Sequence, residues 1–90
     1  MKNGNYKIIF SKQASKDKIL LKNAKLENKY KEILNKMSED PFFYPPSYEK
    51  LCGILNGFYS RRINIQHRIV YKVNDKKHEI HIYRMWTHYE

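Results

Sequence analysis

The sequence is short of cysteine, of acidic residues and of long apolar runs, and each shortage excludes a class of protein. Cys52 is the only cysteine, so no disulfide can form within the chain, and a reducing compartment fits this composition. No apolar run approaches the length of a membrane-spanning helix. The first residues also lack the apolar segment of a signal peptide. We therefore expect a soluble, cytoplasmic protein with no membrane partner.

Basic residues far outnumber acidic ones. The 90 residues include 18 Lys and Arg against 9 Asp and Glu, which gives a net charge of +9 and a pI near 9.7. Such a surplus favours a polyanion or an acidic partner, although lysine that only keeps the protein soluble is the open alternative. Apolar residues make up 41% of the chain, enough for one small core. We expect a single domain over residues 1–90, with residues 1–4 disordered.

The spacing of apolar residues changes along the chain from alternating to helical and back to alternating. A loop containing Pro41, Pro45 and Pro46 separates the helical part from the later strands. The pattern predicts a strand at 6–10, helices at 12–22 and 24–39, and strands at 58–63, 68–73 and 78–85. This order predicts an α+β domain, with the N-terminal strand and two helices packed on one face of a twisted antiparallel sheet.

One face of the predicted sheet carries arginines and has no helix to cover it. The apolar residues expected to point at the helices are Ile63, Ile69, Tyr71, Val73, Ile80 and Ile82. Strand alternation then places Arg62 and Arg68 on the opposite face. Arg61 points the other way from Arg62, so it is either structural or a phosphate contact at the rim. The open face is a candidate anion site.

RNA cleavage without a metal needs a base, a cation and an acid around one phosphate. The base removes the 2′-hydroxyl proton, the cation stabilises charge on the phosphorane oxygens, and the acid protonates the leaving 5′-oxygen. Glu49 is the candidate general base and His88 the candidate general acid. Tyr89 is the candidate aromatic residue that stacks on a nucleobase. Arg62 and Arg68 are the candidate cations. Taken singly, Glu49 is more typical of an acid in a surface loop, and His88 with Tyr89 is more typical of a floppy tail.

We expect neither a metal nor a cofactor. His78 and His81 fall on opposite faces of the predicted strand, so they form a poor metal pair, and Cys52 has no second thiol beside it. A lone cysteine of this kind is more typical of packing than of catalysis.

Three sequence motifs resemble those of one known family. GFYSRRI at 57–63, HRIVYKV at 67–73 and the ending RMWTHY at 84–89 closely resemble the Txe/YoeB toxins of the RelE superfamily, found in bacterial toxin–antitoxin pairs. The resemblance implies a RelE-like fold and a metal-independent, ribosome-dependent endonuclease that cuts mRNA in the A site. It also implies an acidic YefM/Axe-like antitoxin as partner, and some members of the family are homodimers.

The same resemblance assigns roles to individual residues. The family's catalytic glutamate precedes the motif glycine and corresponds to Glu49, and the catalytic arginines correspond to Arg68 and Arg62. The closing histidine and tyrosine correspond to His88 and Tyr89.

Two departures from the family pattern affect these assignments. The best-known members have Pro-Leu-Lys after the glutamate, whereas this chain has Lys50-Leu51-Cys52, so Lys50 is the candidate substrate-binding lysine. The tail around Trp86 is also longer than in some relatives, which bears on how His88 is presented. A module of the same fold that binds the ribosome, RNA or an antitoxin without cutting RNA is the alternative function.

Overall fold

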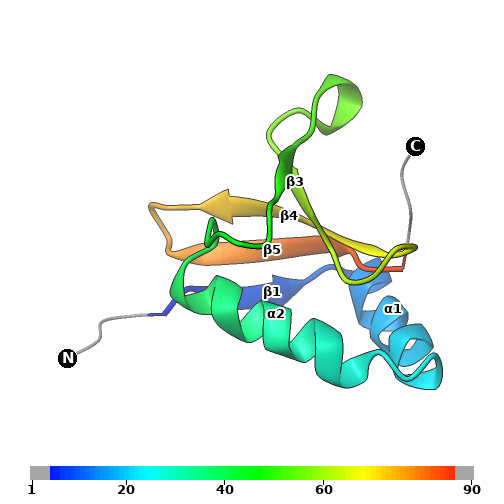
Figure 1. Ribbon diagram of the computed structural model, residues 1–90. Coiled ribbons are helices and arrows are strands. Elements are labelled where there is room, and N and C mark those ends of the chain that lie inside the picture. Colours follow the sequence, from blue (N-terminus) through cyan, green and yellow to red (C-terminus); the bar gives the residue numbers. More distant parts are fainter. Residues whose placement is uncertain (1–4, 87–90) are drawn as a thin grey trace.

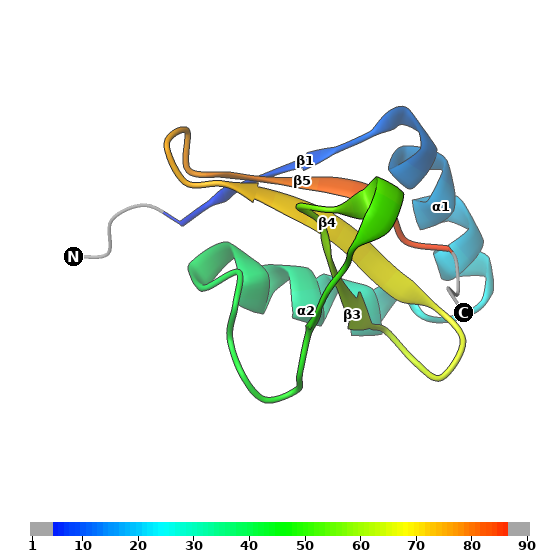
Figure 2. The same cartoon turned by 90° about the horizontal axis from the view of Figure 1, so that it is seen from above.

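The chain folds into a five-stranded sheet with two helices on one face (Figure 1, Figure 2). The computed structural model describes residues 5–86. The expectation of disorder at 1–4 and the predicted site residues His88 and Tyr89 lie outside this range. Among the described residues, no helix is both long and apolar enough to span a membrane. In chain order the elements are β1 (Lys7–Phe10), α1 (Lys12–Asn23), α2 (Glu27–Glu39), β2 (Glu49–Lys50), the short 3-10 helix η1 (Gly53–Leu55), β3 (Tyr59–Arg62), β4 (Arg68–Asn74) and β5 (Glu79–Arg84).

Local hydrogen bonds explain where the helices begin and end. The Ser11 hydroxyl accepts a hydrogen bond from the Ala14 amide at 2.9 Å and caps α1. The Leu26 amide donates back to Leu21, and Lys25 adopts a left-handed φ of 63°, so residues 24–26 complete the end of α1. This turn is why α2 begins at Glu27 rather than at the predicted position 24.

The strand order is β1-β5-β4-β3-β2. Strands β2 to β5 are antiparallel neighbours, as predicted for the sheet, while β1 lies parallel to β5 at one edge, with Lys7 opposite Glu79. The predicted α+β fold is confirmed, and the sheet is mixed because β1 joins it in parallel. The η1 segment projects from the sheet on the side away from the helices (Figure 1).

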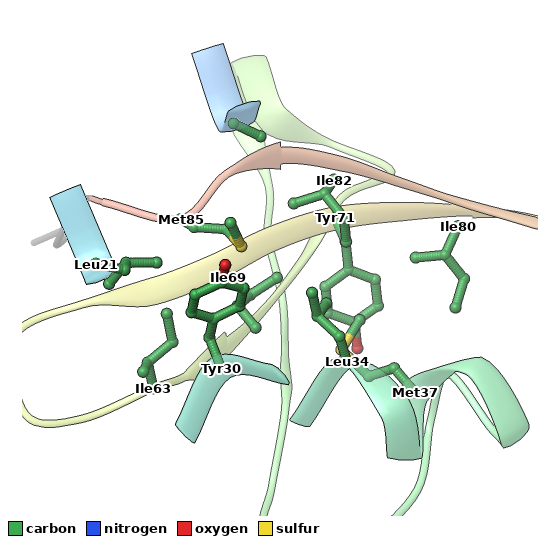
Figure 3. Packing of buried hydrophobic residues seen from close by; sticks show 11 residues of the cluster. Leu21, Tyr30, Leu34, Met37, Ile63, Ile69, Tyr71, Ile80, Ile82 and Met85 are labelled. Carbon is green, nitrogen blue, oxygen red and sulfur yellow. The ribbon is translucent and has the colours of Figure 1, made fainter. Parts of the chain in front are cut away.

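The core lies between the helices and the inner face of the sheet (Figure 3). Helix α2 contributes Tyr30, Leu34 and Met37, which are spaced about one helical turn apart. Five of the six residues expected to face the helices are buried, and the sixth, Val73, packs against the cluster partly buried. The prediction of the inner face is therefore confirmed, and alternation leaves Arg62 and Arg68 on the outer face.

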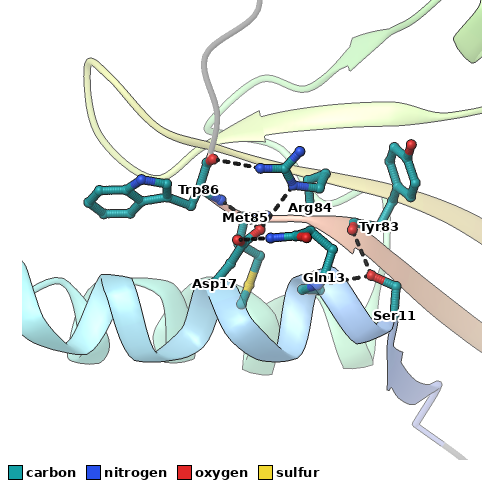
Figure 4. A network of polar contacts seen from close by, with 8 residues as sticks. Ser11, Gln13, Asp17, Tyr83, Arg84, Met85 and Trp86 are labelled. Atoms are coloured by element: carbon teal, nitrogen blue, oxygen red, sulfur yellow. Dashed lines mark hydrogen bonds and ion pairs between the residues drawn. The ribbon is translucent and has the colours of Figure 1, made fainter.

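A buried carboxylate fastens the end of the described chain to α1 (Figure 4). The Asp17 side chain is fully buried, and its Oδ2 accepts hydrogen bonds from the Met85 amide (2.9 Å), the Trp86 amide (3.1 Å) and Arg84 Nε (3.2 Å). Gln13 Nε2 donates to Oδ1 at 3.2 Å. Burial by itself would raise the pKa of Asp17, but these hydrogen bonds outweigh it and hold the pKa below the ordinary value of 3.8.

We predict that Asp17→Asn lowers the free energy of unfolding by about 2 kcal/mol near neutral pH, because hydrogen bonds to a buried charged acceptor are lost. A carboxyl group with a lowered folded-state pKa contributes stability above its unfolded pKa, and this contribution is lost as pH falls through the folded value. Urea unfolding should therefore show the gap between wild type and variant narrowing as pH falls below 3.8.

Asp75→Asn is the matched control, since Asp75 is exposed in the β4–β5 turn. It removes the same charge from an exposed position instead of a buried one, so it should change the free energy of unfolding by less than about 0.5 kcal/mol. A gap for Asp17→Asn that stays constant from neutral to acid pH would contradict the assigned role of the Asp17 carboxylate.

Candidate active site

An ion pair between Glu49 and Arg68 lies on the outer face of the sheet. Glu49 in β2 is opposite Ser60 in β3, and Arg62 in β3 is opposite Arg68 in β4. This register brings Glu49 Oε1 to 2.7 Å from Arg68 Nη1, although the residues are 19 positions apart in sequence. The Arg68 side chain is 17% exposed and that of Glu49 is 64% exposed. The acid therefore faces solvent while the guanidinium is held against the sheet.

These residues line a small cleft of about 100 Å³, formed by Pro46, Ser47, Glu49, Ser60, Arg62 and Arg68. Sequence reasoning missed Ser60, which is buried and whose Oγ accepts a 3.4 Å hydrogen bond from Arg68 Nη1. Strand alternation could have identified Ser60 from the sequence, because it is two residues from Arg62 and shares its face of the strand. The cleft thus joins one carboxylate, two guanidiniums and two serine hydroxyls.

A glycine sets the path of the chain between β2 and β3. Gly57 has φ of 96°, a conformation that strains any residue with a side chain. The Leu51 amide donates to the Phe58 carbonyl at 2.9 Å across this connection. The glycine at the start of GFYSRRI therefore lets the chain return so that Glu49 meets β3 in register.

Arg61 lies on the other side of β3, buried beneath the loop that leads to Glu49. Its guanidinium donates to the carbonyls of Pro46 (2.8 Å), Phe43 (2.6 Å) and Pro41 (3.2 Å), and it stacks 3.9 Å from the centre of the Phe43 ring. Its exposed fraction is 1%. The predicted contact of Arg61 with substrate is therefore wrong, since the side chain has no access to the cleft, and the structural alternative is the one that fits.

Tyr71 reinforces the same loop from β4. Its hydroxyl donates to the Pro41 carbonyl at 3.0 Å. Burial raises the pKa of Tyr71 to about 12, although the nearby Arg61 charge acts in the opposite direction. The hydroxyl consequently stays protonated and remains a donor at all ordinary pH values.

The remaining predicted residues occupy different positions. Lys50 is exposed in β2 next to Glu49 but does not line the cleft. His67 is buried and stacks on Trp86 with ring centres 3.9 Å apart. Trp86 thus packs against the residue before Arg68, and the tail that carries His88 and Tyr89 continues from this point, beyond the described residues.

The cleft suits a ligand that carries both a negatively charged group, which Arg68 can bind, and a neighbouring group that can give up a proton to Glu49. Arg68 presents five N–H donors, so it can keep its bond to Glu49 and still donate to a phosphate. Glu49 is within reach of a ligand held by that guanidinium, because the two side chains are in contact. No group of three potential metal ligands occurs within residues 5–86.

Known proteins share both the sequence pattern and the fold. A profile of the YoeB-like toxins of bacterial type II toxin–antitoxin systems matches residues 10–89. The chain is 38% identical over 60 residues to Toxin YoeB of Synechocystis sp.. These aligned residues cover 67% of this chain but only 63% of that relative. The YoeB dimer from Staphylococcus aureus has a TM-score of 0.80 at 35% identity, covering 94% of this chain and 99% of that one. The YoeB–YefM complex from the same species gives 0.78 at 37% identity, covering 93% and 98%.

We predict that Arg61→Lys lowers the free energy of unfolding by about 2 kcal/mol, because a single ammonium cannot reproduce the planar fork that holds three carbonyls. Arg62→Lys is the matched control on the neighbouring residue. It should unfold at nearly the wild-type urea concentration, because Arg62 is exposed. Equal stability of the two variants would contradict the structural role of Arg61.

Proposed function

The chain belongs to the family of YoeB-like toxins of bacterial type II toxin–antitoxin systems, and from this premise we propose that it is a metal-independent endoribonuclease. Its substrate is mRNA in the A site of the ribosome, and cleavage there stops translation. The observation that carries the proposal is the contact of Glu49 with Arg68 in a cleft on the open face of the sheet. This is the pairing of a base with a phosphate-binding cation that 2′-hydroxyl attack requires.

In the proposed reaction, Glu49 takes the proton of the 2′-hydroxyl, and the oxygen attacks the adjacent phosphorus. The bond from phosphorus to the 5′-oxygen then breaks. Arg68 and Arg62 stabilise the negative charge that develops on the non-bridging oxygens. The products are a 2′,3′-cyclic phosphate on the upstream fragment and a 5′-hydroxyl on the downstream fragment.

We assign the proton for the leaving 5′-oxygen to His88 and base stacking to Tyr89. Both lie outside the described residues. The stacking of Trp86 on His67 supports the assignment, because Trp86 is two positions before His88 in the sequence and lies beside the residue that precedes Arg68. Lys50, exposed next to Glu49 in β2, remains the proposed lysine contact to RNA, outside the cleft.

We also propose an acidic, YefM-like antitoxin as the protein partner. The structural relative from Staphylococcus aureus is a complex of YoeB with YefM, and the net charge of +9 on this chain suits an acidic partner. A second Staphylococcus aureus relative is a YoeB dimer, so a homodimer is the oligomeric state that we propose to test.

Primer extension on a defined mRNA in a reconstituted translation mixture tests the proposed activity. The wild type should cut in the A-site codon only when ribosomes are present. Glu49→Gln and Arg68→Ala should each slow cleavage by about a hundredfold or more, because each removes a group that acts in the transition state. Lys16→Ala, which removes an exposed charge from α1, is the matched control and should cut like the wild type.

Three results would separate the alternatives. Ribosome stalling without cuts would support the non-catalytic binding module. Cleavage that persists in Arg68→Ala would mean that the protein is a nuclease but that Arg68 does not stabilise the transition-state charge. Unchanged translation with the wild type would contradict both functions.

A further inference from the structure

A second hollow lies on the outer face of the sheet, apart from the Glu49–Arg68 cleft. It has a volume of about 390 Å³, and its lining includes Ile9 of β1, Phe58, Lys72 of β4, and His81 and Tyr83 of β5. We propose that this hollow, here called the aromatic subsite, binds a nucleobase of the RNA strand that is cut in the cleft. The inference rests on the proposed function and extends it to a contact outside the reacting nucleotides.

Two aromatic rings form the wall of the subsite. The rings of Phe58 and Tyr83 lie with their centres 5.4 Å apart, tilted by 51°. Tyr83 is 43% exposed, and its ring points away from α1 while only its backbone carbonyl accepts a hydrogen bond from Ser11 (Figure 4). An unstacked base gains by stacking on an exposed ring, and every base has such a face.

The charge of the subsite suits a nucleic acid strand. Lys72 Nζ lies 5.5 Å from the centre of the Phe58 ring, so a cation stands beside the aromatic wall. Among residues 5–86, no acidic side chain lines the hollow. Glu79 lies next to it and pairs with His81 at 3.0 Å, which leaves Lys72 as the cation available to a phosphate.

The aromatic subsite and the catalytic cleft lie on the same face of the sheet, and β4 contributes residues to both. Arg68 and Lys72 are both in β4 and four residues apart, so strand alternation puts them on one side, separated by about 13 Å. Phe58 immediately precedes β3, which carries Ser60 and Arg62 of the cleft. A single extended RNA strand can therefore contact the cleft and the subsite together.

The larger hollow on the helix side does not offer the same chemistry. It has a volume of about 540 Å³ between β1, α1 and α2, and Glu27 is among its lining residues together with Lys18 and Lys22. It is on the opposite side of the sheet from Arg68. The combination of adjoining rings, a cation and continuity with the cleft occurs at the aromatic subsite, and it favours RNA over a protein partner there.

Binding of a non-cleavable RNA by the full chain tests the subsite. The probe is a fluorescein-labelled single-stranded RNA of about 10 nucleotides, with 2′-O-methyl groups that block attack, followed by fluorescence anisotropy. Tyr83→Ala should weaken binding about 5- to 100-fold, the range expected for loss of one stacked base. Tyr83→Phe should bind like the wild type, because the ring is retained. Lys72→Ala should reduce the slope of log affinity against log salt by about 0.7.

Ile19→Ala is the matched control, since Ile19 is an apolar residue of α1 on the helix side and is 63% exposed. It should leave RNA binding unchanged, and urea unfolding of Tyr83→Ala should confirm an intact fold. Equal RNA binding by Tyr83→Ala and wild type would overturn the subsite, as would a wild type that does not bind the probe. If Tyr83→Ala lost binding to a polyglutamate peptide but bound RNA like the wild type, the hollow would be assigned to an acidic protein instead.

The cleavage assay keeps this inference separate from the proposed function. A wild type that cuts mRNA while Tyr83→Ala binds RNA normally overturns the subsite alone. A wild type that binds RNA through Tyr83 but never cuts overturns the nuclease alone.

Discussion

The Arg61 guanidinium is buried without a carboxylate partner among residues 5–86, and three backbone carbonyls of the 41–46 loop take the place of that partner. A buried charge is tolerated only when it is paired or hydrogen-bonded. The three bonds from the terminal nitrogens of Arg61 therefore tie the loop to β3, while the buried Nε has no hydrogen-bond partner among residues 5–86. The loop leads directly into β2. Glu49 can meet Arg68 at 2.7 Å because the chain before it is held in place from the other side of the sheet.

Strand alternation divides the two arginines of the SRR segment between structure and chemistry. Arg61 faces the helix side and holds the loop, while Arg62 faces the open side and lines the cleft. The same alternation along β4 places Arg68 and Lys72 on the open face and Ile69 and Tyr71 in the core. A basic chain of this size can therefore build its core and a positively charged open face from the same strands.

Periodicity was sufficient to predict the inner face of the sheet, because Ile69 and Tyr71 alternate along β4 and Ile80 and Ile82 alternate along β5. It did not predict β2, since a strand of two residues has no period to read. Contacts between distant residues also leave no local pattern: the Asp17 carboxylate accepts from the Met85 amide across 68 positions. The chemistry of RNA cleavage made Glu49 a candidate general base, and the resemblance to a known family then assigned it that role. His88 and Tyr89 remain predictions.

The chemistry of the cut RNA ends shows which oxygen attacks the phosphorus. If Glu49 activates the 2′-hydroxyl beside Arg68, the upstream fragment must end in a 2′,3′-cyclic phosphate or its hydrolysed monophosphate, and the downstream fragment must begin with a 5′-hydroxyl. Mass spectrometry of the two fragments, together with labelling of the downstream end by polynucleotide kinase without prior phosphatase treatment, would detect these ends. A 3′-hydroxyl upstream with a 5′-phosphate downstream would mean that water, not the 2′-hydroxyl, attacks the phosphorus, and would contradict the account.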